Sequence, residues 1–234
     1  MSSVDKNKKI YSFYGSYITR KWNDEVNINY FEKKRGGKHF LRNCLGEAKA
    51  KDLVFNSSLI RSDHNKQWVE SGWKISKELY LYKHYFSGKD LKNITNKEFH
   101  IQKLSQDNFL EIVSIDKEIF EPYWRSSSLS LLDTLKSCRK TIFYTYKEKG
   151  RIQAYAIVGV TMRFSFLQRF AVHPKKQGVG IGSLLLENVL QDMNRRKMIS
   201  MKLNTQPDNI TAQRLYEKNS FILSNKRLLV MGSS

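Results

Sequence analysis

Three glycines gather in a short segment whose spacing could bind an anion. Gly178, Gly180 and Gly182 alternate with Val179 and Ile181, and an apolar run follows directly. Glycines at the start of a helix leave backbone N–H groups unobstructed by side chains, and the helix dipole makes that end positive. The pattern therefore predicts a phosphate-binding turn. A tight strand-to-helix turn without a ligand is the alternative that the glycines alone leave open.

Two common phosphate loops do not fit this segment. The chain contains no GxxxxGK[ST] sequence. The dinucleotide fingerprint GxGxxG would need a glycine where Ser183 stands, and an acidic residue about 20 positions further on. No acidic residue lies between Asp192 and Asp208. A nicotinamide cofactor is therefore not expected.

The segments that must position this turn alternate between strand and helix patterns. From residue 98 onward the periodicity predicts the order β-α-α-β-β-β-α-β-α-β. The first three helices are expected over about 107–120, 128–137 and 181–193. A hairpin is expected at Lys149-Gly150, and Asp208 or Asn209 can cap the last helix. This order predicts an α/β fold with a mixed sheet flanked by helices.

The first 97 residues read as a smaller α/β region, joined to the rest by a linker at 91–98. Shifting this region by 148 residues sets 54–76 against 202–224 without a gap. Four matched pairs result: Asn56 with Asn204, Trp68 with Tyr216, Trp73 with Phe221, and Ser76 with Ser224. We therefore expect two domains, 1–97 and 98–234, and either a degenerate half-repeat of one fold or a chance agreement.

Composition limits the classes of function. The formal net charge of +19 would attract any polyanion, but the basic residues are scattered, so we do not expect direct nucleic-acid binding as the primary role. Cys44 and Cys138 lie far apart and outside any CxxC motif, which predicts neither a disulfide framework nor a metal site. No apolar run reaches 18 residues, and the first residues lack the continuous apolar segment of a secretory signal, so we expect a soluble, cytoplasmic protein with no membrane partner.

Two strings resemble a known family. AVHPKKQGVGIG, residues 171–182, resembles the Q/R-x-x-G-x-G/A signature of the GNAT superfamily of N-acetyltransferases, which stands between a strand and a helix. NITAQRLYEKNSF, residues 209–221, looks like the family's N-x-x-A-x-x-x-Y-x-x-x-G-F segment. The resemblance implies a mostly antiparallel GNAT-like sheet and acetyl-CoA (coenzyme A) as cofactor. It implies these cofactor-binding residues: Phe170, Ala171, Val172, Gln177, Gly178, Val179, Gly180, Ile181, Gly182, Ser183, Asn209 and Tyr216.

A third string narrows the resemblance. SIDKEIFEPYWRSS, residues 114–127, is similar to the segment after the first strand of ribosomal-protein-alanine N-acetyltransferases, which modify the amino terminus of a protein chain. That similarity implies that Phe120, Tyr123 and Trp124 border the acceptor site. The alternative is that these aromatic residues only anchor the loop to the core.

The reaction that the family implies is acetyl transfer to a primary amine, by direct attack in a ternary complex. The acceptor would be a protein amino terminus or a small molecule, and Tyr216 would be the general acid toward the CoA thiolate. The family's glutamate base matches Asn204, which cannot take a proton, so Glu118, Glu121 and His173 are the candidate bases. The alternatives are a non-catalytic acyl-CoA-binding regulator and a basic protein associated with ribosomes or RNA.

Two further departures concern the end of the sheet. The family's glycine before the last strand is Ser220 here, and one terminal strand follows where the family has a hairpin of two. We expect residues 1–97 to supply the missing strand or wall. A monomer or a homodimer agrees equally well with the sequence.

Overall fold

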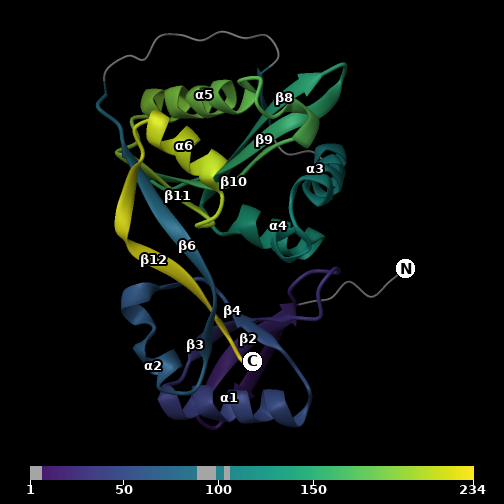
Figure 1. The fold of residues 1–234 in the computed structure, drawn as a ribbon, viewed down its shortest axis with the longest axis vertical. Coiled ribbons are helices and arrows are strands. Elements are labelled where there is room, and N and C mark those ends of the chain that lie inside the picture. The colour runs from purple at the N-terminus through teal and green to yellow at the C-terminus, as the bar shows by residue number, and fades with distance from the viewer. Residues whose placement is uncertain (1–6, 89–98, 103–105) are drawn as a thin grey trace. The chain divides into compact units, whose positions relative to one another are not determined.

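The chain divides into two compact units in the computed structural model (Figure 1). The structure describes residues 7–88, 99–102 and 106–234. One unit comprises Met1–Tyr80 with Asn225–Ser234, and the other comprises Leu81–Ser224. This division differs from the expected boundary between 97 and 98, because strands β6 (Lys74–Tyr85) and β12 (Ile222–Gly232) each begin in one unit and end in the other. The expected linker at 91–98 lies outside the described residues.

The first unit is a small α/β arrangement that begins with a hairpin. Besides its parts of β6 and β12, it contains β1 (Lys8–Ser12), β2 (Gly15–Lys21), β3 (Asn29–Arg35), α1 (Lys38–Ala50), β4 (Phe55–Ser57), β5 (Ile60–Arg61) and α2 (Lys66–Val69). Strands β1, β2 and β3 pair antiparallel, and β3 pairs with β4 in parallel. The end of β12 lies next to β4 in the strand order, where Gly232 pairs with Asn56.

An aromatic core holds the first unit together. Helix α1 buries Phe40, Leu41, Cys44 and Ala48, which share one face at helical spacing. They pack with the buried rings of Tyr17, Phe31, Phe55, Trp68 and Trp73. The Trp73 Nε1 atom donates to the Leu41 carbonyl over 3.0 Å, so its one polar group is satisfied.

The second unit has the predicted order of elements. These are β7 (Phe99–Gln102), α3 (Gln106–Ile119), α4 (Ser128–Lys136), β8 (Lys140–Glu148), β9 (Arg151–Val160), β10 (Phe164–Val172), α5 (Ile181–Arg195), β11 (Ser200–Thr205) and α6 (Ile210–Lys218). The β8–β9 hairpin turns at Lys149 and Gly150, which both have positive φ, as a two-residue turn between twisted strands requires. The GNAT-like α/β fold class is confirmed.

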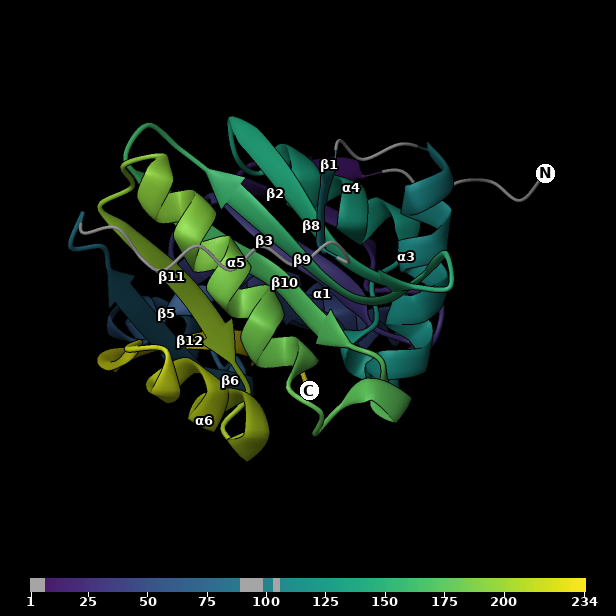
Figure 2. The same cartoon turned by 90° about the horizontal axis from the view of Figure 1, so that it is seen from above.

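Helices cover both faces of the second sheet (Figures 1 and 2). Successive strand residues point to opposite faces. Phe143 packs in the core beneath α3 and α4, whereas the hydroxyl of the next residue, Tyr144, donates to Asp192 on α5 over 2.6 Å. Helices α3 and α4 therefore lie on one face, and α5 lies on the other.

The strand at the far side of β11 comes from the first 97 residues. The strand order in this unit is β7-β8-β9-β10-β11-β6. Strands β7 to β10 pair antiparallel with their neighbours, and β10 pairs with β11 in parallel. Just beyond β6, the Phe86 amide donates to the Ile199 carbonyl over 3.1 Å. The N-terminal region thus supplies a strand next to β11, as the missing terminal hairpin predicts.

Candidate functional site

The glycine segment forms an open turn at the start of α5. Gly178 and Gly180 have φ of 79° and 89°, a left-handed conformation that side chains disfavour. No atom lies within 4 Å of the position that a Cβ would take at either residue. The first amides of a helix lack intrahelical partners, so they face this open space. The turn therefore has the geometry of an anion cradle.

The other residues of the turn brace it. The Gln177 side-chain amide donates to the Val172 carbonyl over 3.0 Å, which ties the turn back to the end of β10. A Cβ at Gly182 would lie 3.5 Å from Val172 Cγ2 and 3.7 Å from Leu215 Cδ2, so Gly182 serves close packing rather than a special φ. The Val179 side chain is exposed.

Strands β10 and β11 part just before the turn. Their parallel register runs from Phe164 opposite Ser200 to Leu167 opposite Leu203, and ends there. On the other side, β10 stays paired with β9 as far as Val172. The edge of Phe170, Ala171 and Val172 that faces β11 therefore has no strand partner within the described part of the chain. This splay leaves an edge of β10 open to an extended ligand.

Tyr216 lies beneath this opening. Its side chain is 5% exposed, and burial raises the pKa of its hydroxyl above the ordinary value of 10.0. Its ring centroid lies 6.5 Å from that of Phe170 and 6.1 Å from that of Tyr82. Among the described residues its hydroxyl makes no hydrogen bond, so this group is available to a ligand.

Asn209 caps the helix that carries Tyr216. Its side-chain oxygen accepts from the Ala212 amide over 3.1 Å, which selects Asn209 over Asp208 as the N-cap. At the other end, Ser220 has φ of 61°, the conformation that the family's glycine supplies without strain. Both ends of α6 are therefore fixed. Whether Asn209 also contacts cofactor stays a prediction.

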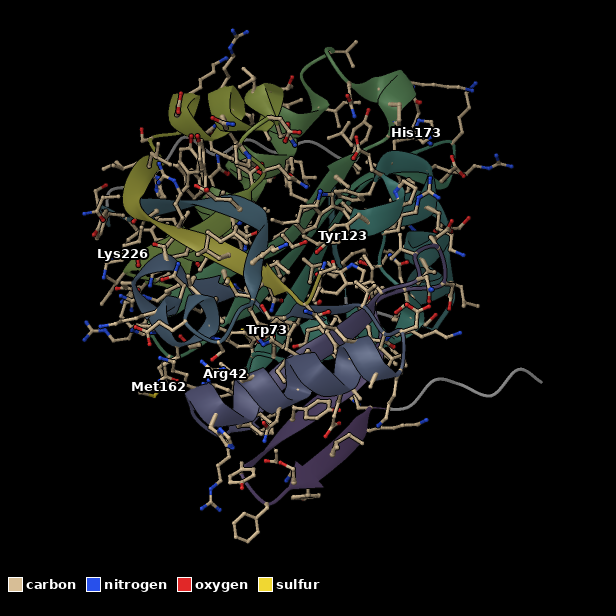
Figure 3. All side chains as sticks on the ribbon, turned by 60° about the horizontal axis from the view of Figure 1, so that its bottom comes forward. Arg42, Trp73, Tyr123, Met162, His173 and Lys226 are labelled. Carbon is tan, nitrogen blue, oxygen red and sulfur yellow. The ribbon has the colours of Figure 1, made fainter. Side chains whose placement is uncertain are left out.

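The predicted acceptor residues form a short loop after α3. Pro122–Trp124 is a 3-10 turn, in which the Tyr123 and Trp124 rings meet edge to face at 4.8 Å. Phe120, Tyr123 and Trp124 are half-buried, and the Arg125 Nε atom donates to the Phe120 carbonyl over 2.8 Å. Figure 3 labels Tyr123 and His173. The loop is thus anchored to the unit, while part of its aromatic surface stays accessible.

Of the three candidate bases, two contact each other. The Nε2 atom of His173 lies 3.1 Å from an oxygen of Glu118. The Nδ1 atom accepts from the Lys175 amide over 3.3 Å, so the proton of the neutral ring is on Nε2 and points at Glu118. Glu118 and Glu121 are both exposed. The contact joins α3 to the end of β10.

Sequence reasoning missed a buried ion pair at this site. The Asp116 carboxylate is fully buried, and it accepts two bonds of 2.8 Å from Arg169. It also accepts from the Tyr155 hydroxyl over 2.6 Å and from the Ser126 amide over 2.7 Å. The sequence could have indicated this pair, because Asp116 and Arg169 each stand among apolar residues on one face of α3 and of β10. Such charges are rarely buried unless they are paired.

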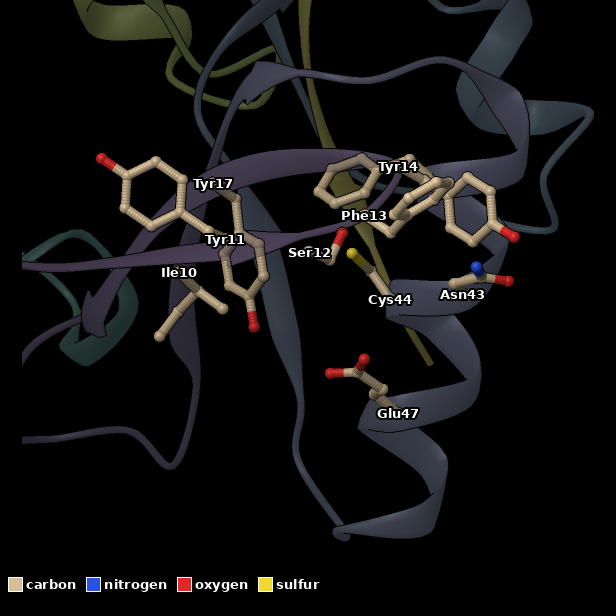
Figure 4. A pocket seen from close by; sticks show the side chains of 10 residues that line it. Ile10, Tyr11, Ser12, Phe13, Tyr14, Tyr17, Asn43, Cys44 and Glu47 are labelled. Atoms are coloured by element: carbon tan, nitrogen blue, oxygen red, sulfur yellow. The ribbon is translucent and has the colours of Figure 1, made fainter.

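A further concavity lies in the first unit, and none of the predicted site residues lines it (Figure 4). Its volume is about 370 Å³. It is lined by Ile10, Tyr11, Ser12, Phe13, Tyr14, Tyr17, Phe40, Asn43, Cys44 and Glu47. Burial and the Glu47 charge raise the pKa of Cys44 to about 12, so this thiol is neutral and unreactive at physiological pH.

Metal and membrane sites are not apparent in the described ranges. There, no group of three or more His, Cys, Asp or Glu side chains could hold a metal ion. Every helix of those same ranges is too short or too polar to cross a bilayer. Both cysteines are free.

Comparison with known sequences agrees with this site. Residues 109–221 match the acetyltransferase (GNAT) family. The ribosomal protein bS18-alanine N-acetyltransferase of Escherichia coli (strain K12) is 31% identical over 74 residues, which cover 32% of this chain and 50% of that protein. The chain spans about half the length of the curated relatives it matches.

Solved structures share the fold. A tandem GNAT protein from the clavulanic acid biosynthesis pathway has a TM-score of 0.64 at 12% identity, covering 94% of this chain and 78% of that one. The ribosomal-protein-S18-alanine N-acetyltransferase from Escherichia coli has a TM-score of 0.50 at 19% identity, covering 57% and 92%. Together with the glycine turn and the splayed strands, these matches show that residues 109–221 form a domain of the acetyltransferase (GNAT) family.

Proposed function

We propose that the second unit catalyses acetyl-CoA-dependent N-acetylation of a primary amine, by direct attack in a ternary complex. The observation that carries this proposal is the open turn at Gly178 and Gly180, placed where β10 parts from β11. Exposed helix-start amides suit a diphosphate. The unpaired edge of β10 suits the extended arm that follows a diphosphate in coenzyme A.

The backbone of β10 would bind the reactive end of the cofactor. When bound, acetyl-CoA supplies the thioester that an amine can attack. Strand β10 stays paired with β9 as far as Val172, so the amides of Phe170 and Val172, which alternate with those that face β9, are held in fixed directions. Fixed donors stabilise developing negative charge on an oxygen, typically by about 3 kcal/mol each.

Tyr216 is the proposed general acid. Because burial raises the pKa of its hydroxyl, this group stays protonated through the neutral and mildly alkaline range. It has no competing partner among the described residues, so it can donate a proton to a departing thiolate.

Glu118 is the proposed base, with His173 as the residue that orients it. The Glu118 carboxylate accepts from the His173 Nε2–H group, which leaves its other oxygen for the ammonium proton of the acceptor. A protein amino terminus has a pKa of about 8, so a modest base is enough to deprotonate it. Glu121, two residues beyond α3, is the alternative base.

A protein amino terminus is the acceptor we favour. The Escherichia coli relative acts on an alanine of ribosomal protein bS18. Phe120, Tyr123 and Trp124 would border the acceptor, as the similarity of residues 114–127 to ribosomal-protein-alanine N-acetyltransferases implies. The net charge of +19 would favour work close to ribosomes in the cytoplasm.

Thiol release from acetyl-CoA tests the proposal, with alanyl and other amino-terminal peptides and polyamines as acceptors. Tyr216→Phe should lower turnover by about a hundredfold or more, as loss of a general acid does, and leave coenzyme A affinity unchanged. Glu118→Gln should lower turnover, and Glu121→Gln should not. Equal turnover in wild type and Tyr216→Phe would refute the acid role.

A non-catalytic acyl-CoA-binding regulator is the second candidate, and Asn204 is the observation in its favour. Asn204 stands where the family has a glutamate base. For this candidate, calorimetry should show coenzyme A binding that is lost in Gly180→Val, while no acceptor supports thiol release.

A further inference from the structure

A bulge in β10 aims two consecutive side chains at the same face of the sheet. The pairing of β10 with β9 slips between Leu167 and Arg169, so Gln168 is the extra residue. Without the bulge, neighbours would point to opposite faces. Instead Arg169 reaches Asp116 on α3, and the Gln168 Nε2 atom donates to the Thr134 carbonyl on α4 over 3.1 Å. The bulge therefore lets one strand hold both helices of the acceptor side.

Arg169 makes most of these contacts. Besides its two bonds to Asp116, its Nη2 atom donates to the Trp124 carbonyl over 2.7 Å. Its guanidinium carbon lies 3.8 Å from the centre of the Phe120 ring. One side chain thus touches α3 and both ends of the aromatic stretch that starts the acceptor loop, residues 120–127.

Asp116 ties the other end of that loop. Its carboxylate accepts from the Ser126 amide, and its remaining bonds go to Arg169 and the Tyr155 hydroxyl. The carboxylate is fully buried, and the Arg169 side chain is 17% exposed. A buried charge that loses a hydrogen-bonding partner is strongly disfavoured, so the loop cannot leave this arrangement without a large cost.

We propose that Arg169 is a positioning residue that sets the acceptor loop relative to the thioester-binding edge of β10. This inference rests on the proposed acyl transfer. Phe170, Ala171 and Val172 follow Arg169 directly, so the group that fixes the loop and the amides that face the thioester share one strand. Loss of the guanidinium fork should therefore weaken acceptor recognition and leave the cofactor turn intact.

The chain contains a matched control for this network. Tyr144, Asp192 and Arg196 form a second Tyr–Asp–Arg group, in which the Asp192 carboxylate accepts from the Tyr144 hydroxyl over 2.6 Å and from Arg196 over 2.8 Å. Asp192 is 6% exposed. This group joins β8 to the end of α5 and contacts no acceptor-loop residue. Its disruption measures the general cost of breaking a buried network.

The experiment compares Arg169→Lys with Arg196→Lys. Lysine keeps the charge but cannot make the two-pronged bond. With an alanyl peptide as acceptor, Arg169→Lys should raise the KM for the peptide at least tenfold, with kcat lowered less than threefold and the coenzyme A dissociation constant within twofold of wild type. Arg196→Lys should change none of these. An unchanged peptide KM, or an equal rise in both variants, would overturn the proposal.

Hydrogen exchange separates this inference from the proposed function. If no acceptor supports turnover by wild type, the proposed function fails, and exchange of the acceptor-loop amides then decides the inference. The Ser126 amide should exchange at least tenfold faster in Arg169→Lys and at the wild-type rate in Arg196→Lys. Trp124, the one tryptophan within Leu81–Ser224, gives a second readout through its fluorescence. Equal protection of the Ser126 amide in both variants would refute the inference that Arg169 fixes the acceptor loop.

Discussion

The two units make the same strand-to-helix connection in different ways. In the first unit β3 ends at Arg35 and α1 begins at Lys38, and Gly36 between them has φ of 122°. A Cβ on Gly36 would lie 2.5 Å from the Phe40 ring. In the second unit eight residues separate β10 from α5, and the positions around Gly180 are open. Shared topology therefore does not give a shared site, because the first turn is short and filled by a ring.

The ends of α2 and α6 are more alike. After α2, the amides of residues 71 and 73 donate to the carbonyl of residue 68, and the amide of residue 72 donates to that of residue 69. After α6, the residues 148 positions further on make the same three bonds. The left-handed residue is Gly72 in one and Ser220 in the other. The ring pairs that close the two turns are Trp68 with Trp73 at 4.9 Å and Tyr216 with Phe221 at 5.8 Å. These bonds support the alignment of 54–76 with 202–224.

The rings at the aligned positions have different surroundings in the two units. Trp68 and Trp73 join an aromatic core with Phe31, and they fill the interior of the first unit. Tyr216 occupies the matching position in the second unit, where its ring borders the opening beside Phe170. Larger rings close the first half, whereas a smaller ring with a free hydroxyl leaves the second half open to a ligand.

Removing the first unit should have the largest effect. A chain of residues 98–234 lacks β6, so the edge of β11 would lose its neighbour and expose unpaired backbone groups. We expect this chain to be insoluble, or to bind no coenzyme A, in expression trials followed by calorimetry. A soluble, fully active 98–234 chain would show that these residues need nothing from residues 1–97.

Alanine at the two turn glycines should separate affinity from stability. Gly180→Ala should weaken coenzyme A binding at least tenfold by calorimetry, and lower the free energy of unfolding by about 1 kcal/mol through its left-handed φ. Gly36→Ala should cost about 3 kcal/mol, because a clash with Phe40 adds to the same strain, and should leave affinity unchanged. A loss of affinity in Gly36→Ala would contradict this division of roles.

Acid should loosen the second unit before the first. Burial lowers the pKa of His84 below 6.5, and its Nδ1 atom lies 3.1 Å from the Asn219 carbonyl, beside the turn after α6. The unfolded chain therefore binds a proton first as pH falls below 6.5, and stability drops by at most about 1.4 kcal/mol per pH unit until the folded pKa is passed. The protection factors of amides 219–221, which correct for the slower intrinsic exchange in acid, should fall as the pH drops below 6.5, whereas those of amides 71–73 should not.

The His84→Gln variant is the control for this pH effect. It should remove the acid-induced change at 219–221, because glutamine does not titrate. A change that persists in this variant would assign the effect to another group.

The smallest effect should come from exchanging the left-handed residues. Ser220→Gly should raise the free energy of unfolding by about 1 kcal/mol, since glycine adopts φ of 61° without strain. Gly72→Ala, at φ of 92°, should lower it by a similar amount. Denaturant unfolding measures both. Changes of the same sign in the two variants would contradict the equivalence of the two turns.

Local signals were enough to predict most of the second unit. Periodicity gave the order of its elements, and the Lys149-Gly150 and Asn209 signals marked a hairpin and a cap that the structure contains. The Asp116–Arg169 pair could not be predicted in this way, because its partners lie 53 residues apart and meet through a bulge. The roles of Tyr216, Asn209 and the acceptor residues stay predictions, since they concern ligands.

The division between the units was harder to predict, because strands that cross from one unit to the other leave no mark in composition. The polar stretch at 91–98 predicts a boundary near 97. The boundary within Lys74–Tyr85 falls inside a regular strand, where apolar and polar residues continue without a break.

The pairing of the end of β12 with β4 also limits the order in which the two units can fold. The first sheet needs the end of β12 beside β4, although residues 225–234 are synthesised more than 140 positions after the rest of that unit. Until then β4 keeps a bare edge that invites mispairing. The nascent N-terminal half must therefore wait, partly assembled, for a segment that is synthesised much later, and chaperone dependence should follow the translation of that segment.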